Sequence, residues 1–204
     1  SNAEIVLNNI LSFNNLNSFM RPSSGSYYRL TNQYSPVTNS DNGYIKNIFL
    51  FRKYAKLNKN IFSFQSNIGN IYSLQNKQID NDNKFSLGGR WLRGFDSYGV
   101  GPRNSSATYI GGNNLAVAKF DISRPLLSLQ SDNPIDLNLF TDIGKVFGNK
   151  ITPTSSTESI RASYGFGVKF YSVIGPIGFS WAFPIEDETF DIKRQFLFTI
   201  GDIN

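Results

Sequence analysis

Apolar and polar side chains alternate with a period of two along most of this chain. The clearest stretch is 177–185, I-G-F-S-W-A-F-P-I, in which every second residue is a large apolar one. Residues 161–171 repeat the pattern, and so does the C-terminal stretch 196–201. Successive side chains of a β-strand point to opposite faces, so these three stretches are predicted to be strands with one apolar face.

Several earlier stretches show the same alternation more weakly. They lie near residues 27–35, 44–56, 61–74, 113–124 and 135–147, and residues 5–13 are a further candidate. Sequences rich in Pro, Gly, Asn and Asp separate them, and no stretch has a helical period with caps. We expect an all-β, antiparallel fold with about eight or nine strands, joined alternately by tight turns and longer loops.

The chemistry of the two strand faces distinguishes two kinds of β protein. A soluble sandwich and a membrane barrel both produce alternation. Here the apolar faces are rich in aromatic residues that recur near strand ends, as in the interfacial girdles of membrane barrels, and the opposite faces are small, polar or charged. The pattern favours a transmembrane β-barrel and leaves a soluble sandwich or barrel open. No apolar run reaches the eighteen or so residues of a membrane helix, which bears on helices alone.

Composition removes several kinds of chemistry. The 204 residues contain no cysteine and no histidine, which excludes a cysteine nucleophile, a Ser-His-Asp site and a histidine-bearing zinc site. The net charge is +5, and the lysines and arginines are scattered along the chain. Their densest cluster, at 51–60, fits a solvated strand end and turn better than a nucleic-acid surface. We expect no enzyme activity, no cofactor, no metal and no nucleic-acid partner. Residues 1–3 look like the remnant of a cleaved tag, which leaves 4–204 as one domain.

One long loop stands out. Residues 85–103, FSLGGRWLRGFDSYGVGPR, combine frequent glycine with aromatic residues and a central Arg93. Glycine at this density weakens both helices and strands, yet the stretch lacks the polar character of a flexible linker. We expect a structured loop over about 86–112. Its hinges are expected at Gly88, Gly89, Gly101, Gly111 and Gly112.

Five stretches in order resemble one known family. They are FSLGGRWLRGFDSYGVGPR, YIGGNNLAVAKFDISRPL, LNLFTDIGKVFG, RASYGFGVKFYSVIGPIGFSWAFPI and RQFLFTIG, preceded by FMRPSSGSYYRL. Together they resemble the C-terminal barrel of the outer-membrane protein assembly factors, the bacterial surface antigen type to which BamA belongs. The resemblance covers nearly the whole chain.

The resemblance implies a place for the loop. In this family an arginine-bearing loop tip folds back into the barrel lumen, and the matching residues here are Leu92, Arg93, Gly94 and Phe95. A partly desolvated guanidinium requires acidic partners. The family places them on the two following strands, at positions that match Asp121 and Asp142. The period of two independently puts Asp142 on the same face as Phe140. An acid/base pair made of the two aspartates is disfavoured, because nothing in the sequence supplies a substrate pocket.

The resemblance also implies a function: folding and inserting β-barrel proteins into an outer membrane through a weak seam between the first and last strands. The last strand, about 194–203, would form one edge of that seam, with Phe196, Phe198, Ile200 and Gly201. The implied partners are the lipid bilayer, unfolded outer-membrane β-barrel substrates, and accessory subunits docked on N-terminal repeats. The matched segment is roughly the last half of a barrel of about sixteen strands. We therefore expect it to be inactive alone and able to associate with itself through unpaired strand edges.

Alternatives stay open. The family usually ends in an aromatic residue, whereas this chain has Ile203 and Asn204. The motif YGVGPR is closer to the mitochondrial sorting-and-assembly subunit and GPIGFSWAFPI to the bacterial protein, so a bacterial outer membrane is favoured over a mitochondrial one. A two-partner-secretion transporter shares the arginine motif. Outside the family, a passive pore or a small ligand-binding barrel would leave the lumen empty, whereas the assembly-factor interpretation fills it with residues 88–112.

Overall fold

The computed structural model describes residues 5–37, 43–75, 77–126, 134–149, 158–172 and 175–201. The expected tag remnant at 1–3 and the last residues, 202–204, lie outside the described part. The helical segment η1 (Asn81–Asn83) is a short 3-10 turn. In the residues described, no helix is long and apolar enough to cross a membrane.

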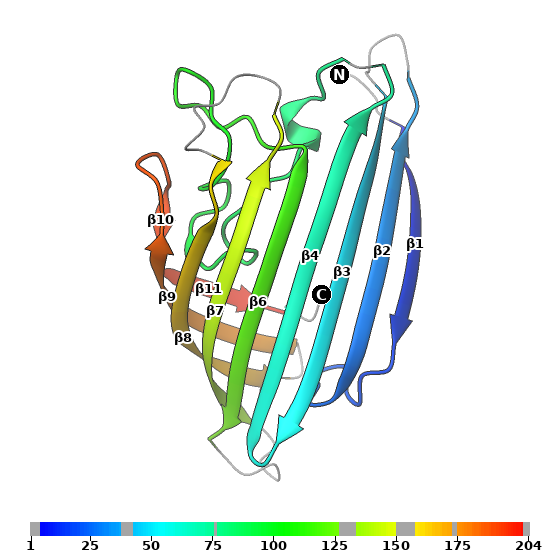
Figure 1. The fold of residues 1–204 in the computed structure, drawn as a ribbon. Coiled ribbons are helices and arrows are strands. Elements are labelled where there is room, and N and C mark those ends of the chain that lie inside the picture. Colours follow the sequence, from blue (N-terminus) through cyan, green and yellow to red (C-terminus); the bar gives the residue numbers. More distant parts are fainter. Residues whose placement is uncertain are drawn as a thin grey trace.

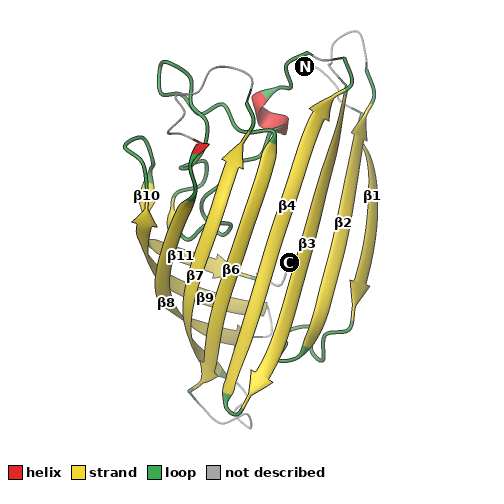
Figure 2. Ribbon diagram, in the orientation of Figure 1, coloured by secondary structure: helices red, strands yellow, loops and turns green. Residues whose placement is uncertain are grey.

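Nine strands form one antiparallel sheet in the order β1-β2-β3-β4-β6-β7-β8-β9-β11, as Figures 1 and 2 show. The remaining two strands, β5 and β10, pair with each other in a small ribbon. The strands are β1 (Leu7–Asn14), β2 (Gly25–Ser35), β3 (Tyr44–Leu57), β4 (Asn60–Ser73), β5 (Gly94–Phe95), β6 (Asn114–Pro125), β7 (Ile135–Phe147), β8 (Arg161–Ser172), β9 (Gly175–Glu186), β10 (Lys193–Arg194) and β11 (Phe196–Ile200). The predicted all-β, antiparallel fold is confirmed, and every predicted strand is present.

The two faces of the sheet differ as the alternation predicts. On β7, Leu139 faces outward and is 63% exposed, whereas Asp142 faces the concave side and is fully buried. Large apolar side chains remain exposed on the outward face of most strands. An apolar surface of this extent requires a non-aqueous partner, which suits the lipid-facing side of a membrane barrel. A row of neighbouring rings crosses five strands on this face: Phe13, Tyr28, Phe51, Phe64 and Phe120.

The sheet is curved but not closed. In Figure 1 strands β1 to β4 and β6 to β8 form a curved wall, and β9 and β11 run across behind it. β1 and β11 lie at the two ends of the sheet, and no pairing joins them in the described part of the chain. The last strand is shorter than predicted. Arg194 belongs to β10, because the chain leaves the sheet before Phe196 to pair with the long loop.

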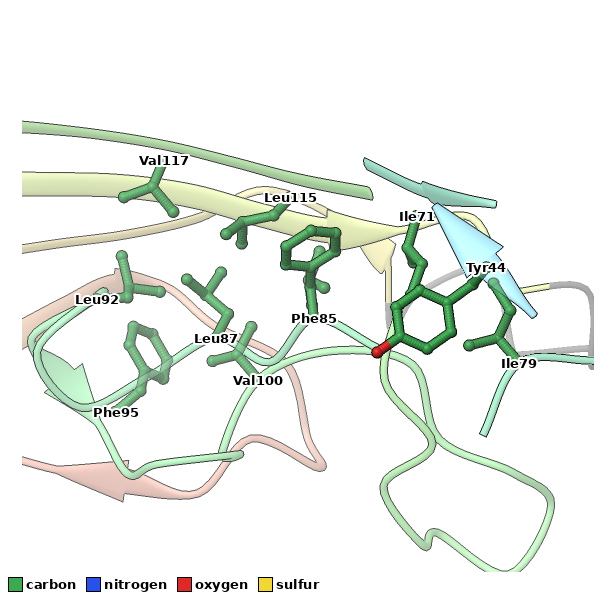
Figure 3. Packing of buried hydrophobic residues seen from close by; sticks show 11 residues of the cluster. Tyr44, Ile71, Ile79, Phe85, Leu87, Leu92, Phe95, Val100, Leu115 and Val117 are labelled. Carbon is green, nitrogen blue, oxygen red and sulfur yellow. The ribbon is translucent and has the colours of Figure 1, made fainter. Parts of the chain in front are cut away.

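The hydrophobic core lies on the concave side, at the end of the sheet that carries the long loops. There the loop between β4 and β6 packs against strand residues that face inward, as Figure 3 shows. The cluster consists of Tyr44, Ile71, Ile79, Phe85, Leu87, Leu92, Phe95, Val100, Leu115, Val117 and Val146. Because most of these residues come from the loop or from the strands beside it, burial of the loop and folding of this part of the sheet depend on each other.

Candidate functional site

The lumen loop, residues 86–112, folds back along the concave side of the sheet. Short antiparallel bridges hold it in shape, between Phe85 and Gly112 and between Leu87 and Val100. Tyr109 donates a hydrogen bond of 2.7 Å from its hydroxyl to the carbonyl of Phe85. Burial raises the pKa of Tyr109 above its ordinary value, which already lies well above neutral pH.

Glycine makes two of the sharp bends in this loop possible. Gly88 has a φ of 126°, and a side chain there would meet the carbonyl oxygen of Asp96. Gly101 has a φ of 131°, and a side chain there would run into Val146. Both backbone conformations disfavour other residues. Of the other predicted hinges, Gly89 and Gly111 also have positive φ, whereas Gly112 does not and is instead closely packed against the backbone of Phe147.

Arg93, at the tip of the loop, contacts both predicted carboxylates. It donates to Asp142 from Nε at 2.7 Å, from Nη2 at 2.5 Å and from its backbone N–H at 3.1 Å. It donates to Asp121 from Nη1 at 2.9 Å and from Nη2 at 3.0 Å. The sheet places the two aspartates on the concave faces of β6 and β7. Both oxygens of Asp121 reach the guanidinium.

Three further residues contact Arg93 or its carboxylate partners. The guanidinium carbon lies 3.5 Å from the centre of the Phe140 ring, which suits a cation–π contact. Ser163 on β8 donates a hydrogen bond of 2.5 Å to the carbonyl of Arg93. Lys119 approaches Asp142 at 3.9 Å and offsets part of the second negative charge. We call this assembly the loop anchor: Arg93 with Asp121, Asp142, Phe140 and Ser163.

The residues beside Arg93 are also held. Leu92 and Phe95 are buried in the hydrophobic cluster, and Gly94 and Phe95 form β5. The hydrophobic cluster and the ion pairs of Arg93 together hold the loop tip in place. The site therefore binds a charged side chain that belongs to the chain itself. In the described residues, no group of three or more acidic residues is arranged to hold a metal ion.

The predicted seam residues lie at the end of the sheet. Phe196 pairs with Trp181 and Phe198 with Phe179 on β9, and the aromatic rings of both pairs are in contact. Ile200 ends the strand, and Gly201 follows it with a φ of 69°. Because β11 pairs only with β9 among the described strands, its other edge carries backbone groups that no described strand pairs with.

A second arginine site was not predicted. It lies at the opposite ends of the strands from the long loops. Arg21, in the turn between β1 and β2, donates from Nε to Asp136 at 3.0 Å, and its Nη2 also bonds this carboxylate. Tyr171 on β8 donates to the same carboxylate at 3.0 Å. We call this assembly the base clasp. The period of two could have indicated Asp136, which shares the concave face of its strand with Asp142, but the arginine lies 115 residues away.

A cavity of about 170 Å³ separates the two arginine sites on the concave side. Arg93 and Asp121 line one part of it, and Asp136 and Tyr171 line another. The lining is mostly polar, as expected for the lumen side of a membrane barrel. A second unpredicted ion pair joins Arg161 on β8 to Asp191 in the connection between β9 and β11, at 2.5 Å, and is almost fully buried.

Comparison with known proteins relates the chain to two groups of membrane proteins. A family model described as the Omp85 superfamily domain matches residues 2–203. A SAM50-like protein of Schizosaccharomyces pombe is 26% identical over 187 residues, covering 86% of this chain and 39% of that protein. The outer membrane protein assembly factor BamA of Neisseria meningitidis is 26% identical over 137 residues, covering 54% of this chain and 17% of that protein.

Two further similarities agree. BamA of Neorickettsia risticii is 25% identical over 174 residues, covering 81% of this chain and 22% of that protein. The crystal structure of BamA from Haemophilus ducreyi lacking POTRA domains 1–3 superposes with a TM-score of 0.82 at 25% identity, covering 95% of this chain and 41% of that one. The chain thus spans well under half the length of the relatives it matches.

Proposed function

The chain belongs to the Omp85 superfamily, and we propose that it is the C-terminal barrel segment of an outer-membrane assembly factor that folds and inserts β-barrel proteins. At the level of the family, it is related to BamA and SAM50 and therefore to outer membranes, bacterial or mitochondrial. We propose the bacterial outer membrane, on the bacterial character of residues 175–185. The complete protein's substrates would be unfolded outer-membrane β-barrels.

The proposed mechanism uses the free edge of β11. A strand edge with unpaired N–H and C=O groups can template an incoming strand by β-augmentation, with no bond-making chemistry and no cofactor. In a complete barrel this edge would meet the first strand in a weak seam. The seam would open sideways into the bilayer, so that a substrate strand could pair there and then leave into lipid.

The observation that best supports this proposal is the loop anchor. Arg93 makes five hydrogen bonds to two carboxylates on the concave side of the sheet, which would make the loop a fixed plug in a closed barrel. A passive pore would need that space for permeating solutes. The anchored loop would instead support the wall formed by β6, β7 and β8 while the seam opens.

The test uses the complete gene product that contains these residues, reconstituted in proteoliposomes. A denatured outer-membrane β-barrel is added from urea, and its folding is followed by heat-modifiable gel mobility. We expect folding to be faster by at least about tenfold than in empty liposomes. A bacterial and a mitochondrial porin, compared as substrates, separate the two membranes: faster folding of the bacterial porin supports the bacterial assignment.

Two controls sharpen this test. The 204 residues alone are expected to give the rate of empty liposomes, because the first strand of the complete barrel, which would form the other side of the seam, lies outside this segment. Conductance for small ions without any increase in the folding rate, from the complete protein, would overturn the proposal in favour of a passive pore.

A further inference from the structure

The connection between β9 and β11, residues 187–195, joins the lumen loop to the proposed seam strand. Lys193 and Arg194 form β10, which pairs antiparallel with Gly94 and Phe95 of β5. These are the two residues that directly follow Arg93. The same connection then runs into β11, which begins at Phe196. The loop tip and the seam strand are thus only a few residues apart along a hydrogen-bonded path.

Backbone hydrogen bonds extend this contact beyond the two pairs. The N–H of Asp96 donates to the carbonyl of Ile192 at 2.8 Å, and the N–H of Ile192 donates to the carbonyl of Gly99 at 3.1 Å. A Cβ atom at Gly99 would lie 2.7 Å from the carbonyl oxygen of Ile192, so the close approach requires glycine. On the other side, the N–H of Ala182 in β9 donates to the carbonyl of Gln195 at 2.8 Å.

A buried ion pair fixes the far end of this connection to the wall. Arg161, at the start of β8, donates to Asp191 from Nε at 2.5 Å and from Nη2 at 3.2 Å. The side chains are 1% and 3% exposed. Asp191 also accepts a hydrogen bond of 2.7 Å from the backbone N–H of Glu188, which shapes the turn. A carboxylate so buried and so fully bonded holds the connection in one position.

We infer that residues 187–195 couple the loop anchor to the seam strand, with Asp191 and Arg161 as the positioning residues. While Arg93 is anchored, β5 holds β10 and the start of β11 stays against β9. Release of Arg93 frees β5, and with it the start of β11. The coupling is reciprocal, so a substrate strand that pulls on β11 weakens the hold on Arg93.

This inference rests on the proposed function only in taking β11 as the seam edge. It concerns how the edge is held, and it can be measured without any insertion assay. An exposed pair within the connection serves as the matched control: Lys193 with Asp187 at 2.7 Å. This pair does not touch the loop anchor.

The experiment is hydrogen–deuterium exchange of the 204-residue chain in lipid nanodiscs, read for the amides of Phe196–Ile200 that pair with β9. We expect Arg93→Ala and Asp191→Asn to raise their exchange rate at least about tenfold, and Asp187→Asn to change it less than twofold. Faster exchange at residues 94–96 with no change in β11 would overturn the inference, because the loop would then move without the strand.

A cross-link separates coupling from general loosening. The chain has no cysteine of its own. Asp96→Cys and Arg194→Cys, introduced together, can therefore be joined specifically by a short bis-maleimide. In the Arg93→Ala background this bridge should restore slow exchange in β11 if the ribbon carries the coupling. Unchanged fast exchange after cross-linking would show that Arg93 acts on β11 by another route. If the coupling holds but the proteoliposome assay is silent, the proposed function fails and this inference stands.

Discussion

Two arginines reach into the concave side of this sheet from opposite ends, and they are held differently. Arg93 comes from a long loop and bonds two carboxylates, with an aromatic ring against its guanidinium. Arg21 comes from a short turn and bonds one carboxylate, which it shares with Tyr171. Its side chain is 14% exposed, against 7% for Arg93. The number of partners and the depth of burial both rank the loop anchor as the stronger of the two sites.

The difference also separates two structural roles. The loop anchor holds the tip of the loop 86–112 against the concave side of the sheet, where the core packs against it. The base clasp ties the turn between β1 and β2 to the start of β7 and so limits how far the curved sheet can open. One site holds the loop in place, and the other holds the curvature of the sheet.

The largest effect is expected from Arg93→Ala. The change leaves Asp121 and Asp142 buried without their main partner, which costs about 3–5 kcal/mol in comparable buried pairs. The free energy of unfolding, from urea titration in lipid, measures the loss. Arg93→Lys is the control: it keeps the charge but loses the planar fork, so we expect only partial recovery. A loss for Arg93→Ala no greater than for Arg21→Ala would break the ranking.

A smaller effect is expected from Arg21→Ala. Asp136 loses its charged partner but keeps the hydroxyl of Tyr171, so we expect a loss of about 1–3 kcal/mol in the same titration. Spin labels on the two edge strands, β1 and β11, report how far the sheet opens. In Arg21→Ala we expect the mean distance between them to increase and the distribution of distances to broaden. The same distances in Arg93→Ala should change less. If both variants widen the sheet equally, the division of roles is wrong.

The smallest effect is expected from Arg194→Ala. Arg194 bonds Asp96 at 3.2 Å, and both side chains are exposed, so solvent screens the attraction. We expect a change of less than about 1 kcal/mol in the urea titration. A loss comparable to that of Arg21→Ala would mean that burial does not rank these three arginines.

The alternation of residue types predicted the fold because a two-residue period depends on each strand alone. Leu139 and Asp142 are separated by an odd number of positions along one strand, so their side chains point to opposite faces. The family resemblance pointed to Arg93, Asp121 and Asp142, and the structure places Arg93 within hydrogen-bond distance of both aspartates. Their role in the lumen loop remains a prediction.

The contacts that went unpredicted depend on how the sheet curves. Arg21 and Asp136 are brought together only by the curvature of several strands, which the period of two does not encode. Nothing in the sequence around Asp191 identifies Arg161 as its partner. The late start of the last strand, at Phe196, has the same origin: Lys193 and Arg194 pair with a loop that lies about a hundred residues earlier.

The separation between Arg93 and its carboxylates constrains the order in which this chain can fold. Asp121 follows Arg93 by 28 residues and Asp142 by 49, so neither carboxylate is in place until β6 and then β7 have joined the sheet. During that interval a loop that entered early would carry an unpaired guanidinium beside the bilayer. Formation of β4, β6 and β7 is therefore expected to precede burial of the loop tip, and the ribbon with β10 can close only afterwards, when the C-terminal strands arrive. The last strand to be added is thus also the one whose arrival reports that the loop is already in place.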